Sequence, residues 1–393
     1  MPTNKHRLFA TGFSALTVLT AFLLTSCSAD APAAAAGDNA VLKDYVADYA
    51  DDAVVGRPDL TRVIAPFFED PALAETRAIL VMHGGRVIAE RYAPGYGPDS
   101  KLISWSMAKT VTATLAGLMV ADGRLSLDEP APVAQWRSAN DGRNRVTLRH
   151  LLHMTSGLDH TEGVEPGNPN PIYQADTTRM LFLDGRDDVA RYAETRVLEA
   201  APGEKFEYSS ATSHIIADII TRALTDSKDP AVRRDALLEY ARGRLFEPLG
   251  ITSMTPEFDR SGTMLGGSII HATARDWAKL GEFLRNNGSV RSAQLLPTSW
   301  IRFMRTSSKN NPAYGGHVWI NKPRSDGRRQ VLFPDKAPSD VFAMLGHLGQ
   351  YVVVSPQHKL VIVRLGHTPD AMLAPIDDQL ANLINLFPVS ARK

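Results

Sequence analysis

The chain has 393 residues with 43 basic and 43 acidic side chains, and 44% of its residues are hydrophobic. This length allows a large buried core, and the balanced charge excludes the basic surface that nucleic-acid binding requires. The single cysteine excludes both an intramolecular disulfide and a cysteine-rich metal site.

The N-terminus is typical of a bacterial export signal. A short positively charged segment ends at Arg7, and an apolar stretch interrupted only by small or hydroxyl residues runs from Leu8 to Leu24. The stretch ends in Leu24-Thr25-Ser26-Cys27, which resembles a bacterial lipobox, whose cysteine is lipidated and becomes the mature N-terminus. We therefore predict a lipoprotein signal peptide over residues 1–26 and a lipid on Cys27. An ordinary signal peptide that happens to contain a cysteine is the alternative.

Residues 27–54 are predicted to be a flexible tether, because the alanine-rich run at 31–36 has little to bury. No later stretch reaches about 18 uninterrupted apolar residues, so no transmembrane helix is expected. The sequence thus predicts an exported domain that is lipid-anchored to a bacterial membrane and faces the periplasm or the exterior.

The remaining chain, 55–393, is predicted to be one catalytic domain of the α+β class. A hairpin is expected over Ala78–Met82 and Arg86–Tyr92, and strands return near His317–Asn321, Val341–Leu345, Tyr351–Ser355 and Leu360–Leu365. Helices are expected over Thr147–His153, Val189–Leu198, Ala211–Leu224, Val232–Leu245, Thr273–Arg285 and Met372–Leu386. This order predicts an antiparallel sheet built from both chain ends, flanked by helices, with a mostly helical lobe inserted at about 107–290.

The segment Ser106-Met107-Ala108-Lys109 begins another predicted helix, which runs to Ala121. A serine and a lysine three apart lie on one helix face, so a neutral Lys109 can accept the proton that makes Ser106 a nucleophile. Free backbone N–H groups at this helix start can assist an oxyanion. An exposed lysine and a helix-start serine are the alternative on spacing alone.

Two further segments add candidate site residues. Tyr208 precedes a predicted helix, and its phenol can complement Lys109 as a phenolate or as a proton relay. His347 lies in Leu345-Gly346-His347-Leu348-Gly349-Gln350, between two apolar strand-like runs where glycines allow close approach. The alternatives are a half-buried packing tyrosine and a glycine bulge with an incidental histidine.

Together these segments make the chain resemble the penicillin-recognising serine hydrolases, and within them the class C β-lactamase-like group. That group includes D-alanyl-D-alanine carboxypeptidases, family VIII esterases and 6-aminohexanoate-dimer hydrolase. Ser106-Met107-Ala108-Lys109 matches its nucleophile motif, Tyr208-Ser209-Ser210 matches Tyr-x-Asn/Ser, and His347-Leu348-Gly349 occupies the place of Lys-Thr-Gly. The resemblance covers roughly residues 55–390 and implies a β-lactamase/transpeptidase-like fold.

The resemblance implies an acyl-enzyme on Ser106, with Lys109 and Tyr208 sharing the proton transfers. It also implies an oxyanion hole made from the Ser106 backbone N–H and one N–H near Gln350. Ser210, His347, Gly349 and Gln350 are expected to bind the substrate, and so is Tyr173, as a second tyrosine of the cleft.

The substrate is expected to be a small ester, amide or peptide. The family's third motif usually supplies a lysine that faces a substrate carboxylate, whereas this chain has His347 there, and a histidine lacks the permanent charge of a lysine. We therefore expect ester or linear amide hydrolysis, with D-alanyl-D-alanine carboxypeptidase or β-lactamase activity as the alternative. A catalytically silent surface-binding module is the alternative from another class. No metal or other cofactor is expected, because the histidines are scattered without ligand spacing.

Overall fold

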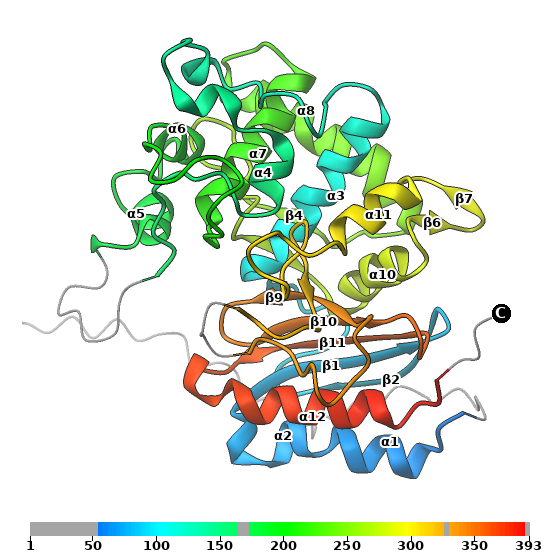
Figure 1. The fold of residues 1–393 in the computed structure, drawn as a ribbon. Coiled ribbons are helices and arrows are strands. Elements are labelled where there is room, and N and C mark those ends of the chain that lie inside the picture. The colour runs from blue at the N-terminus through cyan, green and yellow to red at the C-terminus, as the bar shows by residue number, and fades with distance from the viewer. Residues whose placement is uncertain (1–53, 164–172, 326–329, 390–393) are drawn as a thin grey trace, which may run out of the picture. The chain divides into compact units, whose positions relative to one another are not determined.

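A six-stranded antiparallel sheet built from both ends of the chain is the centre of the fold (Figure 1). The computed structural model describes residues 54–163, 173–325 and 330–389. The strand order is β2-β1-β11-β10-β9-β8. Its members are β1 (Glu75–His83), β2 (Arg86–Tyr92), β8 (Trp319–Ile320), β9 (Phe342–Gly346), β10 (Gln350–Ser355) and β11 (Leu360–His367). The predicted α+β class and the sheet from both termini are confirmed.

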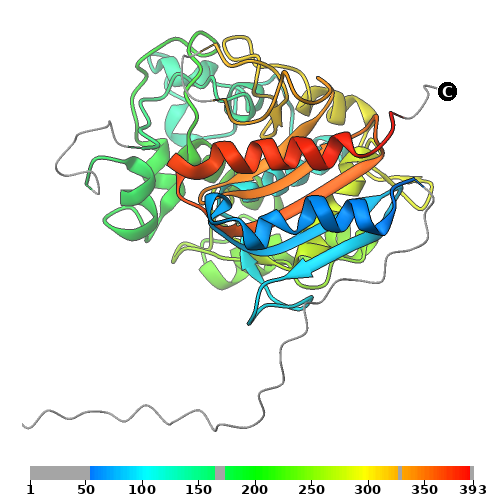
Figure 2. The same ribbon diagram turned by 90° about the horizontal axis from the view of Figure 1, so that it is seen from below.

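Alternation along the strands explains how the sheet is covered on both faces. Leu80 and Met82 of β1 belong to one apolar cluster, and Ile79 and Val81 belong to the other, because successive side chains of a strand point to opposite faces. Helices α1 (Arg57–Ile64), α2 (Pro66–Glu69) and α12 (Leu373–Asn385) cover the Ile79 face (Figure 2). Helix α10 (Ala274–Arg285) packs on the other face, against β10 and β11.

Most other helices lie on the α10 side of the sheet, between the two groups of strands in sequence (Figure 1). They are α3 (Ala108–Ala121), α4 (Leu148–Leu152), α5 (Asp176–Phe182), α6 (Val189–Glu194), α7 (Ser210–Leu224), α8 (Pro230–Ala241), α9 (Glu247–Leu249) and α11 (Thr298–Met304). Helix α3 is buried over nearly its whole length, and α7 packs against it. This buried pair carries the first and second sequence motifs.

Capping residues set several helix starts where the sequence predicts them. The Thr273 side chain accepts a hydrogen bond from the Asp276 backbone N–H at the start of α10, and the Thr147 side chain does the same for His150 in α4. Such caps satisfy N–H groups that have no partner inside the helix.

Three differences from the predicted elements have physical causes. Helix α6 ends at Glu194 instead of Leu198, because Val197 and Leu198 pair with the backbone at residues 158–159. Helix α8 begins at Pro230, where the Asp229 side chain caps it, and passes into a π turn after Ala241. The short helices α1, α2, α5 and α11 were not predicted, and neither was the small sheet of β3 (Leu102–Ile103), β5 (Ile270–Ala272) and β4 (Thr255–Pro256). These helices have four to eight residues and the strands two or three, which carry too little periodicity.

None of the helices in the described part of the chain has the length and apolarity needed to cross a membrane. The predicted signal peptide and Cys27 lie outside the described residues, as does all but the last residue of the predicted tether.

Candidate active site

Ser106 lies in a 3₁₀ turn (Trp105–Met107) that leads directly into α3. The preceding residue, Trp105, has a φ of 45°, a region that L residues rarely adopt and that is often found at functional sites. The Ser104 hydroxyl donates to the Trp105 carbonyl and accepts from the Ile270 backbone N–H, at 2.8 and 3.0 Å. These bonds attach the strained turn to strand β5.

Lys109 is buried, with 2% of its surface exposed, and its ammonium nitrogen has three close partners. The Nζ atom lies 3.0 Å from Ser106 Oγ, 2.7 Å from Ser210 Oγ and 2.7 Å from the Gly267 carbonyl oxygen. Burial lowers the pKa of Lys109 to about 8, and the negative charge of Glu162 partly opposes this shift. A large fraction of the amine is therefore neutral near pH 8.

Tyr208 precedes α7, and its ring and phenol both face the Ser106–Lys109 pair. Its hydroxyl is hydrogen-bonded to Ser106, and Lys109 Nζ lies 4.8 Å from its ring centroid. Burial, together with Glu162, raises the pKa of the Tyr208 phenol well above its usual range, although the bond to Ser106 acts in the opposite direction. The environment therefore favours the protonated phenol over the phenolate.

Ser210, the first residue of α7, contacts Lys109 on one side and a glutamate on the other. Glu162 accepts the Ser210 hydroxyl at 2.6 Å and the Ser210 backbone N–H at 2.5 Å. It also accepts the Thr177 hydroxyl at 2.6 Å. Sequence reasoning missed Glu162, because a single carboxylate in a polar loop 48 residues before Ser210 carries no local signal.

Two glycines permit the close approach of backbones in this region. A Cβ on Gly267 would lie 2.6 Å from the Ser210 carbonyl oxygen, and a Cβ on Gly346 would lie 2.1 Å from the Ser104 carbonyl oxygen. Gly346 is the last residue of β9. The end of this strand therefore contacts the backbone of the turn that carries Ser106.

His347 follows β9 in a tight turn whose shape depends on Gly349 and Gln350. The Gln350 side chain is buried and donates to the carbonyls of His347, Leu348 and Gly366. Gly349 has a φ of 78°, and its carbonyl accepts a hydrogen bond from buried Arg364. Both residues thus support the turn, while the His347 ring packs edge-on against Trp105, with 5.5 Å between the ring centroids.

A cavity of about 470 Å³ opens beside Ser106. It is lined by Ser106, Glu162, Tyr208, Trp319, Arg324, Val331, Leu345, Gly346, His347, Tyr351, Asp370 and Leu373. Of the predicted substrate-binding residues only His347 is in this lining, and the His347 Nδ1 atom lies 3.7 Å from Asp370 Oδ1. Tyr173 is 66% exposed and does not line the cavity, while Ser210, Gly349 and Gln350 support it from behind. Arg324 and Trp319 are additional lining residues that the sequence analysis did not identify.

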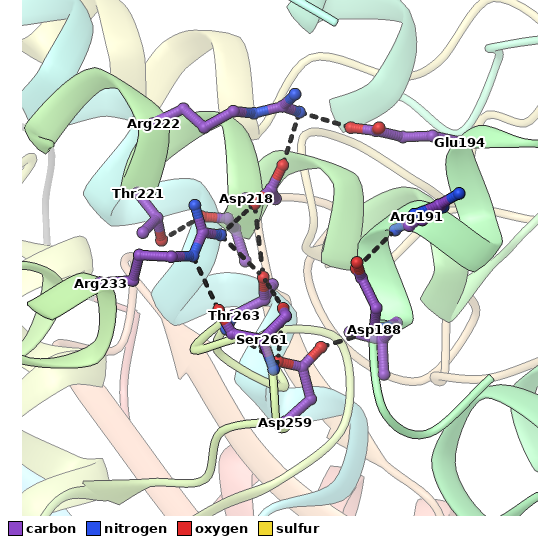
Figure 3. Close-up of polar contacts among 12 residues, drawn as sticks. Asp188, Arg191, Glu194, Asp218, Thr221, Arg222, Arg233, Asp259, Ser261 and Thr263 are labelled. Atoms are coloured by element: carbon purple, nitrogen blue, oxygen red, sulfur yellow. Dashed lines mark hydrogen bonds and ion pairs between the residues drawn. The ribbon is translucent and has the colours of Figure 1, made fainter. Parts of the chain in front are cut away.

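A larger hollow of about 760 Å³ lies in the helical lobe and is lined by charged residues, among them Asp188, Glu194, Asp218, Arg222 and Arg233. Figure 3 shows the guanidinium groups of Arg222 and Arg233 directed toward carboxylates, so these charges pair with one another. The lining of this hollow includes none of Ser106, Lys109 and Tyr208, and we interpret it as a structural ion network. Within the described residues no cluster of histidine, cysteine and acidic side chains is arranged to hold a metal.

Comparison with known proteins agrees with this geometry. The sequence model of the family described as Beta-lactamase matches residues 69–386. The chain belongs to the beta-lactamase family. As a member of the beta-lactamase family it is a serine hydrolase, and the family resemblance drawn from its motifs is confirmed.

The proteins similar to this chain include a hydrolase and a carboxylesterase. The 6-aminohexanoate-dimer hydrolase of Paenarthrobacter ureafaciens is 23% identical over 298 residues, which cover 75% of this chain and 73% of that protein. A family VIII carboxylesterase superposes with a TM-score of 0.60 at 14% identity, over 87% of this chain and 98% of the other. A penicillin-binding protein homolog from Caulobacter crescentus has a TM-score of 0.58 at 17% identity, over 86% and 98% of the two chains. These superpositions support the beta-lactamase fold.

Proposed function

We propose that this protein hydrolyses ester or linear amide bonds through an acyl-enzyme on Ser106. The observation that carries the proposal is the set of partners around Lys109 Nζ. A neutral amine has two N–H donors and one lone pair, and the two shortest contacts, to Ser210 Oγ and the Gly267 carbonyl, take the donors. The lone pair is then left for the Ser106 hydroxyl at 3.0 Å, as a general base requires.

In the proposed reaction Ser106 Oγ attacks the substrate carbonyl carbon while its proton moves to Lys109. The carbonyl electron pair moves to oxygen, and the leaving group then departs with a proton supplied through Tyr208 and Lys109. Water releases the acyl group by the same sequence, with Lys109 again accepting the proton.

The oxyanion needs two N–H donors, and the Ser106 backbone supplies one in this proposal. We infer that the second lies at the edge formed by β9 and His347, whereas the family resemblance implies one near Gln350. The Val341 carbonyl accepts a hydrogen bond from the Asn321 N–H on the β8 side. Because the backbone groups of every second residue of a strand point to the same side, those of residues 343, 345 and 347 also point toward the β8 side. Strand β8 pairs only with Phe342 and Ala343, which leaves the N–H groups of Leu345 and His347 at an open edge that lines the cavity.

The cavity wall supports a substrate with an apolar part. Val331, Leu345 and Leu373 line it together with Trp319 and Tyr351. Its charged residues comprise two carboxylates, Glu162 and Asp370, and one arginine, so the lining offers no net positive charge for an anionic substrate. We therefore expect uncharged esters and linear amides to be better substrates than β-lactams, which carry a carboxylate. The named hydrolase and carboxylesterase relatives support this expectation.

Covalent labelling with a fluorophosphonate probe tests the proposal directly. The wild type should be labelled on Ser106, and Ser106→Ala should lose the label together with roughly 10⁴–10⁶ of kcat. Its thermal transition should stay near that of the wild type, because the substitution removes one half-buried hydroxyl oxygen. Labelling retained in Ser106→Ala would contradict the assignment, and a wild type without labelling or hydrolysis would support the silent binding module.

A substrate panel tests the preference among acyl groups. A short-chain p-nitrophenyl ester should have a kcat/KM at least about tenfold above that of nitrocefin, a difference of about 1.4 kcal/mol. His347→Lys should narrow this ratio by adding a permanent charge for the nitrocefin carboxylate. Efficient nitrocefin turnover without esterase activity in the wild type would contradict the preference.

We also propose that the enzyme is exported and anchored by a lipid on Cys27, on the basis of the sequence alone. Intact-mass analysis of the mature protein should find an acylated cysteine at its N-terminus. Cleavage at another position, or an unmodified Cys27, would exclude the anchor.

A further inference from the structure

A continuous chain of hydrogen bonds connects the candidate base to a carboxylate that the mechanism above does not use. Lys109 Nζ donates to Ser210 Oγ at 2.7 Å, and Ser210 Oγ donates to Glu162 Oε1 at 2.6 Å. The Ser210 backbone N–H holds the other carboxylate oxygen, Oε2, at 2.5 Å. Ser210 and Lys109 are both buried, and Glu162 at the end of the chain is half-buried.

The direction of these bonds follows from the chemistry of the groups. An ionised carboxylate only accepts hydrogen bonds, and a hydroxyl has a single proton to donate. The Ser210 proton is therefore used by Glu162, and its oxygen is left to accept from Lys109. The Gly267 carbonyl can only accept as well, so the two N–H bonds of a neutral Lys109 have fixed partners.

We propose that Glu162 is a positioning residue for acyl transfer: by taking the Ser210 proton, it makes Ser210 an acceptor for Lys109 and directs the lysine lone pair to Ser106. The proposal rests on the acyl-transfer function proposed above. Glu162 does not itself exchange a proton in this scheme. The Ser106 proton moves to Lys109, the Ser210 proton stays on Ser210, and the carboxylate remains an anion facing the ammonium that forms.

Glu162 also lines the cavity, and a carboxylate there could instead bind a cationic group of a substrate. Three donors already bind its two oxygens, namely the Ser210 N–H, the Ser210 hydroxyl and the Thr177 hydroxyl. This geometry favours the positioning role, because the carboxylate is held against Ser210 by bonds within the protein. Substrate binding is one of the outcomes that the experiment separates.

Among the described residues, the titratable groups that face Lys109 leave Glu162 as the one carboxylate whose charge acts on it. Tyr208 is a neutral phenol, for the reasons given above. His214 on α7 and His317 before β8 are fully buried, and burial lowers the pKa of each to about 3, with the charge of Lys109 lowering it further. Both imidazoles are therefore neutral at the pH values of the experiment.

The test measures the rate of fluorophosphonate labelling of Ser106 from pH 5 to 10, which requires no knowledge of the substrate. The rate should rise with pH as Lys109 becomes neutral. Glu162→Gln removes the anion that favours the ammonium, so the rise should move to lower pH by roughly half to one unit. The amide can also donate to Ser210 and turn its hydroxyl toward Lys109, so the plateau should fall about tenfold, the size of one pKa unit.

Two further variants complete the design. Glu162→Asp keeps the negative charge. The pH at which its labelling rate rises should therefore stay close to that of the wild type, even if the maximal labelling rate falls. Asp159→Asn removes an exposed carboxylate three residues away in the same loop, and it should behave as the wild type in both respects.

A Glu162→Gln plateau equal to that of the wild type, or a rise that stays at the wild-type pH, would overturn the proposal. An increase in KM confined to cationic substrates, with the rise unmoved, would assign Glu162 to substrate binding instead. A wild type that is not labelled at all would refute the acyl-transfer function, which is a different failure from an unshifted profile in a labelled enzyme.

Discussion

Lys109 is the residue whose environment most directly predicts a measurable pH dependence. Burial disfavours its charged form and lowers its pKa from 10.5 to about 8. Because the neutral amine is the proposed base, kcat/KM should rise about tenfold per pH unit below pH 8 and level off above it. Steady-state kinetics with an uncharged ester over this range measures the profile.

Two substitutions check that this profile belongs to Lys109. Lys109→Ala should lose roughly 10²–10⁴ in kcat/KM, as removal of a general base does, and should lose the rise centred near pH 8. Lys101→Ala removes an exposed lysine and serves as the matched control with a wild-type profile. A rise that persists unchanged in Lys109→Ala would assign the titration to another group.

The residues found by sequence reasoning and those missed by it differ in how far their contacts reach along the chain. Ser106 and Lys109 are three residues apart, and the contact between them follows from helix geometry alone. Glu162 reaches Ser210 across 48 residues, and Lys109 reaches the Gly267 carbonyl across 158. Those contacts depend on how α3, α7 and the loops pack, which no local pattern encodes.

At the scale of elements, strand β9 positions the site through one close backbone contact. Its final residue, Gly346, faces the Ser104 carbonyl oxygen so closely that an added Cβ would lie 2.1 Å from it. The same carbonyl accepts a hydrogen bond from the Met107 N–H inside the turn that carries Ser106. A shift of the strand or of the turn would therefore change the distance between Ser106 and the open edge of β9.

Gly346→Ala should consequently lower kcat by roughly 10²-fold, the cost of misplacing a reacting group by about 1 Å. The measurement is esterase kinetics together with thermal unfolding of the purified variant. Gly97→Ala is the matched control, because no heavy atom lies within 4 Å of an added Cβ at that position. Wild-type activity in Gly346→Ala would show that the contact between β9 and the turn does not set the geometry.

Element prediction succeeded where a strong pattern and a boundary signal coincide. The β1–β2 hairpin and helix α10 with its Thr273 cap are examples. The turn at residues 347–349 shows what could not be predicted from the local sequence. The sequence indicates glycines beside a strand, but the open edge of β9 depends on where its pairing with β8 stops, and Ile320 of β8 lies 22 residues from its partner Phe342.

At the scale of the whole molecule, the helical lobe is held together by the ion network of Figure 3. Arg222 of α7 bonds both Glu194 at the end of α6 and Asp218 in α7, the latter at 2.6 Å. Arg233 of α8 also pairs with Asp218 and bonds the Ser261 carbonyl. Three helices and the 259–263 loop thus share one buried network, which supports α7 and its motif from behind.

Glu194 should make the stability of this lobe depend on pH. It is 3% exposed, and burial raises its pKa from 4.5 to about 7, with Asp218 adding to the shift and Arg222 opposing it. Between about pH 4.5 and 7 the folded protein then binds more protons at this site than the unfolded chain. The free energy of unfolding must fall as pH rises through this window, because ionisation of a buried carboxyl is disfavoured in the folded state.

Glu194→Gln keeps the shape of the side chain and removes this titration, while Arg222 retains its bond to Asp218. The temperature of the unfolding midpoint should decrease between pH 5 and pH 7.5 in the wild type. In Glu194→Gln we expect this decrease to be smaller by a few degrees. Glu239→Gln, at an exposed position on α8, should show the full wild-type decrease. Thermal unfolding followed by circular dichroism at both pH values gives the comparison, and equal decreases in Glu194→Gln and the wild type would show that the network titrates elsewhere.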